Sequence, residues 1–130
     1  MRSTKTEKKS MNLISNKGKG KCDCVVRAIA SFFGKSWDEV YLALGEIGFE
    51  LKDMPNSKQV YEKYLLQLDY TKMKMPRRED NTRYTVKEFV EELCQNAIVS
   101  VANHLTCVKD GKLIDSWDCS HKSVGNYFTK

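Results

Sequence analysis

The chain has 130 residues, of which 41% are hydrophobic and 30% charged, a composition typical of one globular domain. No stretch approaches the ~18 consecutive apolar residues that a membrane span needs, and the N-terminus lacks the apolar core of a signal peptide. We therefore expect a cytoplasmic protein that does not bind membranes.

The formal net charge of +5 is concentrated at the N-terminus, where residues 1–21 sum to +6 and the rest of the chain to −1. Residues 1–20 are polar and contain glycine, which predicts a basic flexible tail ahead of one folded domain over residues 21–130. Such a tail is either a solvated leader or a weak contact with nucleic acid through residues 1–21.

The apolar spacing from Cys24 predicts a helix that stops at Gly34, a residue suited to a C-terminal cap. "SWDE" at 36–39 is a capping box, with a serine followed three residues later by glutamate. It predicts a second helix that ends near Gly48.

Ser57 is placed to cap a third helix that extends to Leu68, and the alternation in residues 69–75 predicts an exposed strand. "TVKE" at 85–88 is a second capping box and predicts a fourth helix to about Gln95.

Residues 97–118 are rich in β-branched side chains and carry Asp110–Gly111 between two alternating runs, a strong hairpin signal. A final strand is expected through Val124, Tyr127 and Phe128. Helices followed by antiparallel strands predict an α+β fold, with N-terminal helices packed on a small antiparallel β-sheet.

A two-residue turn at Asp110–Gly111 places His104 opposite Trp117 and Thr106 opposite Asp115. Opposed side chains share a face of the sheet, so His104 and Asp115 become diagonal neighbours. A carboxylate in that position can accept a proton from the imidazole and hold the ring in one tautomer.

Asp118 is the alternative acid, but it falls on the opposite face unless a bulge intervenes, so the register favours Asp115. Cys24 supplies a possible third member, because a thiol at a helix N-terminus lies at the positive end of the helix dipole. A cysteine followed far downstream by a histidine and an acid is typical of a nucleophile, a base and its orienting group.

Five cysteines are an odd number, and we expect reduced thiols rather than a disulfide framework. Cys94 on the fourth helix and Cys107 on the hairpin's other face are predicted core residues. The rival to a catalytic thiol is a zinc site formed by Cys22, Cys24, Cys119 and His121. The spacing of one residue in "CDC" disfavours it, since structural zinc sites usually have gaps of two to four.

The order of these elements resembles that of papain-like cysteine peptidases. "DCVVRAIA" at 23–30 is similar to the helix start of small bacterial leader-peptide peptidases, and "NHLTCVKDGKLIDSWD" at 103–118 to their histidine strand, glycine turn and acid strand. Small phage proteins carry the same two blocks. The resemblance covers residues 16–40 and 97–120.

The resemblance implies a thiol hydrolase acting on a peptide or protein substrate, with Cys24 as nucleophile, His104 as base and Asp115 as orienting group. It implies no cofactor or metal. The family usually has a glutamine before the cysteine to bind the oxyanion, and this chain has none. Asn16 is the candidate replacement, together with the backbone N–H of Cys24.

Three further residues are expected near the site: Cys22 and Asp23 would line the approach, and Trp117 would fill core, shield the base from water, or both. Arg27 either pairs with an acid or lies on the surface, and the sequence does not decide. The alternative function is a catalytically inactive binding module of phage type that binds a host protein, which would place it in the host cytoplasm. The sequence does not indicate the oligomeric state.

Overall fold

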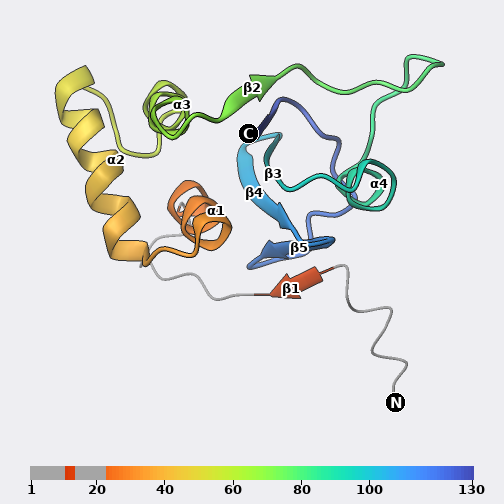
Figure 1. Cartoon of the computed structure of the whole chain (residues 1–130), viewed down its shortest axis with the longest axis horizontal. Helices are drawn as coiled ribbons and strands as arrows, with labels where there is room; N and C mark the ends of the chain where they lie inside the picture. Colours follow the sequence, from red (N-terminus) through yellow and green to blue (C-terminus); the bar gives the residue numbers. More distant parts are fainter. Residues whose placement is uncertain (1–10, 14–22) are drawn as a thin grey trace.

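A computed structural model describes residues 11–13 and 23–130 of the chain. The elements in chain order are β1 (Met11–Leu13), α1 (Cys24–Phe33), α2 (Trp37–Leu51), α3 (Lys58–Gln67), β2 (Thr71–Met73), α4 (Val86–Glu88), the π-helical turn η2 (Phe89–Leu93), β3 (Ala97–Val101), β4 (His104–Lys109), β5 (Lys112–Asp115) and β6 (Tyr127–Thr129). The predicted α+β class is confirmed, with the N-terminal helices packed on a small sheet (Figure 1).

The described strands form one sheet in the order β1-β5-β4-β3-β6-β2. All neighbouring pairs are antiparallel except β1 and β5, which are parallel. Helices α1, α2 and α3 lie on one side of the sheet, and α4 with η2 lies on the other (Figure 1).

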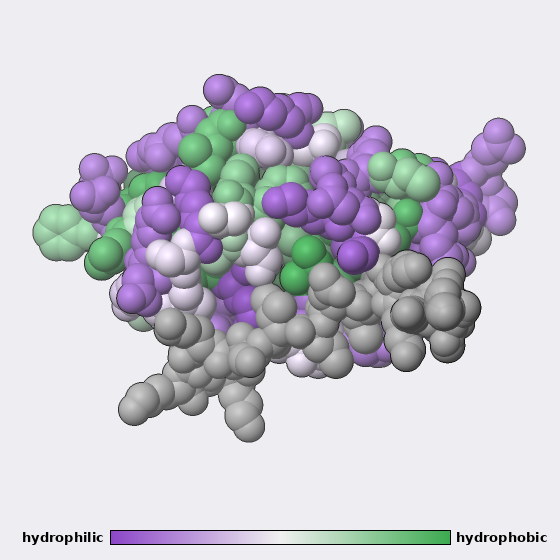
Figure 2. Space-filling view, turned by 60° about the horizontal axis from the view of Figure 1, so that its bottom comes forward, coloured by the Kyte–Doolittle hydropathy of each residue, from purple (hydrophilic) through white to green (hydrophobic). Residues whose placement is uncertain are grey.

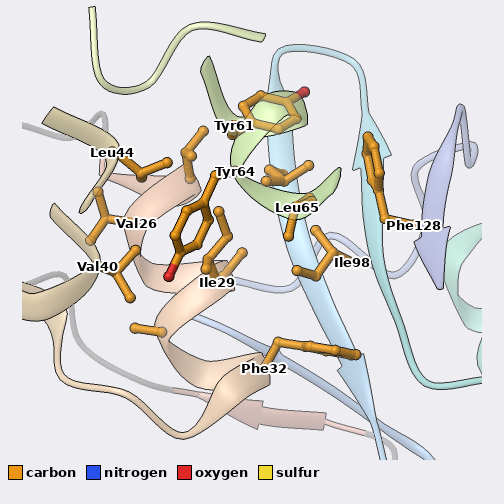
Figure 3. Packing of buried hydrophobic residues seen from close by; sticks show 14 of the residues in the cluster. Val26, Ile29, Phe32, Val40, Leu44, Tyr61, Tyr64, Leu65, Ile98 and Phe128 are labelled. Atoms are coloured by element: carbon orange, nitrogen blue, oxygen red, sulfur yellow. The ribbon is translucent and has the colours of Figure 1, made fainter. Parts of the chain in front are cut away.

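The sheet separates two hydrophobic clusters, because alternate residues of a strand point to opposite faces. Ile98 of β3 packs in the cluster of α1, α2 and α3, whereas its neighbours Ala97 and Val99 pack in the cluster of α4 and η2. Figure 3 shows Ile29 of α1 and Leu65 of α3 directed toward Ile98. A strand covered on both faces explains why residues 97–101 are almost continuously apolar.

The end of α1 and the starts of α2 and α3 follow the local signals, although the Ser57 side chain makes no capping hydrogen bond. Gly34 caps α1 in the left-handed conformation, and the Ser36 side chain accepts the Glu39 N–H at 3.1 Å. However, α2 continues three residues beyond the predicted end at Gly48. Gly48 serves a close backbone approach instead, because a Cβ there would lie 2.6 Å from the carbonyl oxygen of Asp53.

The predicted capping box at Thr85 and Glu88 is present, but α4 keeps α-helical form for only three residues before it widens into η2. Cys94 ends that turn in the left-handed conformation, with φ of 52°. Its side chain is exposed, so its assignment to the core is wrong, whereas Cys107 is fully buried as predicted.

The hairpin is confirmed at the predicted turn. Asp110 and Gly111 both have positive φ, 55° and 75°, as a two-residue type I′ turn requires. Lys109 pairs with Lys112, the register that the turn predicts. A second turn at residues 102–103, where Asn103 has φ of 56°, divides the preceding run into β3 and β4 and was not predicted.

The N-terminal segment contributes a strand. Residues 11–13, which the sequence places in a flexible tail, form β1, and Leu13 pairs with Asp115 of β5. The remainder of the predicted tail, residues 1–10 and 14–20, lies outside the described residues. At the C-terminal end, β6 begins at Tyr127, so Val124 lies outside the final strand although it is buried.

The surface is chemically mixed. Hydrophobic and hydrophilic side chains are interspersed on the face shown in Figure 2, as is usual for a surface in contact with water. Across the described part of the chain, no helix has both the length and the apolar character needed to cross a membrane.

Candidate active site

Cys24 is the first residue of α1 and is half-buried. The Cys24 side chain lies beside the His104 side chain and the Leu105 backbone N–H, both at the start of β4, close enough for each to favour the thiolate form. The first turn of α1 contains no acidic residue that would oppose a negative charge on the sulfur. The two ends of the predicted constellation, 80 positions apart in the sequence, therefore meet at one point.

His104 contacts the predicted acid directly, with 2.6 Å between His104 Nε2 and Asp115 Oδ2. The Thr106 hydroxyl donates to the same oxygen at 2.5 Å. Trp117 lies beside the imidazole, with 5.0 Å between ring centroids, but it is 40% exposed. The predicted register therefore places all four side chains correctly, while the core-filling interpretation of Trp117 is wrong.

The Asp115 carboxylate is 2% exposed and fully hydrogen-bonded. Its Oδ2 accepts from His104, Thr106 and, at 3.6 Å, the Cys119 thiol. Its Oδ1 accepts from Arg27 at 3.1 Å and from the Ser116 N–H at 2.7 Å. Burial alone would raise the pKa of Asp115, but the hydrogen bonds from His104 and Thr106 outweigh it and lower the pKa to about 2.

The pKa values of Cys24 and His104 move in opposite directions. Burial would raise the pKa of the Cys24 thiol, but the hydrogen bonds from His104 and Leu105 lower it below its ordinary value. Burial would lower the pKa of His104, but hydrogen bonds with Asp115, Cys119 and then Cys24 raise it to about 11. The lowered pKa of Cys24 and the raised pKa of His104 both favour a thiolate beside an imidazolium. Because Nε2 is held by Asp115, Nδ1 is the nitrogen left to exchange a proton with Cys24.

Arg27 is part of the site, which the sequence left open. It is 6% exposed and lies between two carboxylates, donating from Nη1 to Asp23 and from Nη2 to Asp115. Asp23, expected to line the approach, is instead buried against Arg27 and also accepts from Trp37 Nε1 at 3.1 Å. The spacing of four residues between Asp23 and Arg27 on a helix was the available signal for the first contact.

A cavity of about 730 Å³ opens over the two reactive side chains. Its lining includes Cys24, His104 and Trp117, with further side chains from the β3–β4 turn and from the start of α3. This volume lies within the range of sites that bind small molecules or short segments of chain. Residues 48–84 are the segment in which substrate specificity is expected, but they contain no motif that would single out these residues of α3.

Three candidates remain: Asn16, Cys22 and Asp118. Asn16 and Cys22 lie outside the described residues, as does most of the basic segment proposed to contact nucleic acid. Asp118 is exposed, and its side chain accepts the Ser120 N–H at 2.9 Å. The choice of Asp115 over Asp118 thus agrees with the geometry.

Within residues 23–130, His104, Asp115 and Cys119 are the one group whose ligand atoms lie close enough to hold a metal ion. The group does not include Cys24 or His121, so the zinc site suggested by the sequence is not assembled by the described residues. Two ligands of a tetrahedral zinc ion lie about 3.3 Å apart, whereas His104 Nε2 and Asp115 Oδ2 are 2.6 Å apart. The spacing is that of a hydrogen bond and does not fit a metal.

Comparison with known proteins adds no assignment to this geometry. The chain matches no protein-family model, and it has no significant match among curated proteins or solved structures. Its function is therefore argued from the site itself.

Proposed function

We propose that this protein is a papain-like thiol hydrolase that cleaves a peptide or isopeptide bond. The observation that carries the proposal is the position of His104, which is hydrogen-bonded to Asp115 and lies beside Cys24 in the lining of one cavity. The order of these residues along the chain, a cysteine followed far downstream by a histidine and an acid, is typical of such enzymes.

The proposed reaction begins from a Cys24 thiolate and a protonated His104. The Cys24 thiolate attacks the substrate carbonyl carbon and forms a C–S bond, while His104 gives its proton to the leaving amine as the C–N bond breaks. Water then attacks the thioester, His104 accepts its proton, the C–S bond breaks and the carboxylic acid leaves. Asp115 keeps the imidazole ring in place through both steps.

Stabilisation of the oxyanion requires donors near Cys24. The first N–H groups of an α-helix, including that of Cys24 at the start of α1, have no partner within the helix, and Asp23 does not cap them with its side chain. Asn16 remains the proposed side-chain donor. The mechanism needs no cofactor, and we place the protein in the cytoplasm, or in the host cytoplasm if a phage encodes it.

The test is the rate at which iodoacetamide alkylates each cysteine of the folded protein as the pH is varied, measured by peptide mass spectrometry. We expect Cys24 to react below pH 7 at least about tenfold faster than the exposed Cys94. His104→Ala should remove that difference. Cys107 is the internal control for buried thiols, since burial raises its pKa to about 12 and it should not react.

Equal rates at Cys24 and Cys94 would contradict the hydrolase. The alternative would then be an inactive papain-like module that binds a host protein, for which an activated thiolate is unnecessary.

A further inference from the structure

The start of α3 forms one wall of the cavity above Cys24. Asn56, Lys58 and Tyr61 from this segment line it, and Lys58 and Tyr61 are three residues apart on one side of the helix. The wall belongs to the middle of the chain, where the sequence offers no motif.

Lys58 is an exposed, charged residue of this wall that has no ion-pair partner among the described residues. Arg27 and His104, which also belong to the lining, differ from Lys58 because both form ion pairs with buried aspartates. Tyr61 stays uncharged, because burial above all, together with the charges of Glu62 and Cys24, raises its pKa to about 12.

The rest of the lining adds no negative side chain. Within the described residues, the cavity is lined by no aspartate or glutamate. The neutral side chains of Ser100, Asn103 and Ser116 complete the polar surface. The neutral polar side chains can form hydrogen bonds with a peptide backbone. The Lys58 ammonium, which has no ion-pair partner among the described residues, can bind a carboxylate.

We propose that Lys58 binds a carboxylate of the substrate, so that the enzyme prefers peptides with an acidic side chain near the scissile bond. Lys58 is exposed at the rim of the cavity, so the substrate chain can continue past it, which favours an acidic side chain over a chain terminus. The substrate preference rests on the proposed hydrolase function, but the preference of the cavity for a negative charge can be measured without a substrate.

The experiment compares two alkylating agents of similar size, iodoacetate with a carboxylate and iodoacetamide without one. Alkylation rates at Cys24 are measured by peptide mass spectrometry in the full chain at pH 8.5, where even a thiol of ordinary pKa is substantially ionised. The readout is the ratio of the iodoacetate rate to the iodoacetamide rate, which cancels changes in thiolate content. The variants are Lys58→Gln, Lys58→Glu and Lys58→Arg, with Lys63→Gln as the matched control on the same helix.

We expect Lys58→Gln to lower the ratio about three- to fivefold, as expected for one partly solvated ion pair, and Lys58→Glu to lower it further. Lys58→Arg should retain the ratio because it retains the charge, and Lys63→Gln should retain it because Lys63 does not line the cavity. High salt should lower the wild-type ratio toward that of Lys58→Gln.

An unchanged ratio in Lys58→Gln and Lys58→Glu would overturn the inference, and so would an equal fall in Lys63→Gln. The proposed function fails on a different result, the absence of selective Cys24 alkylation below pH 7. The two failures are therefore distinguishable in the same preparation.

Discussion

Two arginine residues of this protein each lie between two carboxylates, but in opposite environments. Arg27 is 7% exposed in its side chain, and the two aspartates beside it are 6% and 2% exposed. Arg78 bonds to one glutamate on α4 and one on η2 at 3.0 and 2.7 Å, with side chains 29% to 45% exposed. Arg78 also lies 4.4 Å from the ring centroid of Tyr84.

The ion pairs of Arg27 are buried and position the site, whereas those of Arg78 are exposed on the surface. Removing one partner from a buried ion pair leaves the other charge without water or a counter-ion, whereas an exposed charge is resolvated. Arg27 on α1 is also hydrogen-bonded to Asp115 at the end of β5, which lies 88 positions away in the sequence. It therefore holds the element that carries Cys24 against the strand that carries Asp115.

The largest effect is expected from Asp115→Asn, because both Arg27 and His104 lose their shared carboxylate. We expect the free energy of unfolding to fall by about 3–5 kcal/mol. Alkylation of Cys24 at pH 6.5 should slow by roughly tenfold or more, since the imidazolium loses its counter-ion. Urea denaturation and peptide mass spectrometry measure the two quantities. The exposed Asp118→Asn is the control, and equal behaviour of the two variants would contradict this role of Asp115.

Arg27→Gln should come next, with a loss of about 3 kcal/mol in the free energy of unfolding, because it leaves two buried carboxylates facing each other. Cys24 alkylation should slow severalfold, since the charge of Arg27 also lowers the pKa of Cys24. Arg27→Lys should be intermediate in urea denaturation, because an ammonium lacks the planar fork that reaches both carboxylates. Full stability in Arg27→Gln would show that the buried pair is dispensable.

The stabilisation provided by the buried Asp115 carboxylate should depend on pH. The pKa of Asp115 in the folded protein, about 2, is below its unfolded value, so the stabilisation is complete above about pH 4 and is lost as the pH falls from 4 to 2. The difference in unfolding free energy between the wild type and Asp115→Asn should therefore be largest near pH 5 to 6 and shrink toward pH 2. It should also shrink as the pH rises above about 6.5, because Asp115 raises the pKa of His104 to about 11 and the unfolded chain loses that proton first. A constant difference down to pH 2 would mean that the carboxylate is not the stabilising group.

The smallest effect is expected from Arg78→Gln, because water and salt already screen its two ion pairs. Thermal unfolding followed by circular dichroism should give a melting temperature within about 2 °C of the wild type. Alkylation of Cys24 should not change. A fall in melting temperature as large as that of Arg27→Gln would contradict the expectation that the buried arginine stabilises the fold more than the exposed one.

Features that depend on near neighbours in the chain could be derived from the amino-acid sequence alone. The Asp110–Gly111 turn admits one register, and the alternation of a strand then places His104, Thr106 and Asp115 on one face. Helix caps work in the same way, since Gly34 and the Ser36 hydroxyl act on groups within a few residues. Geometry of this kind is set by bond lengths and dihedral angles, so it can be derived from a short stretch of sequence.

Contacts between side chains or strands that are distant in the sequence are set by tertiary packing. Arg27 on a helix gave no sign of its second carboxylate, and Lys58 belongs to the cavity only because α3 packs beside α1 and the sheet. The turn before Asn103 and the pairing of β1 with β5 were missed for the same reason, as strand pairing is selected by the whole core. Such contacts depend on how the hydrophobic faces of separate elements are buried together, and no local pattern contains that information.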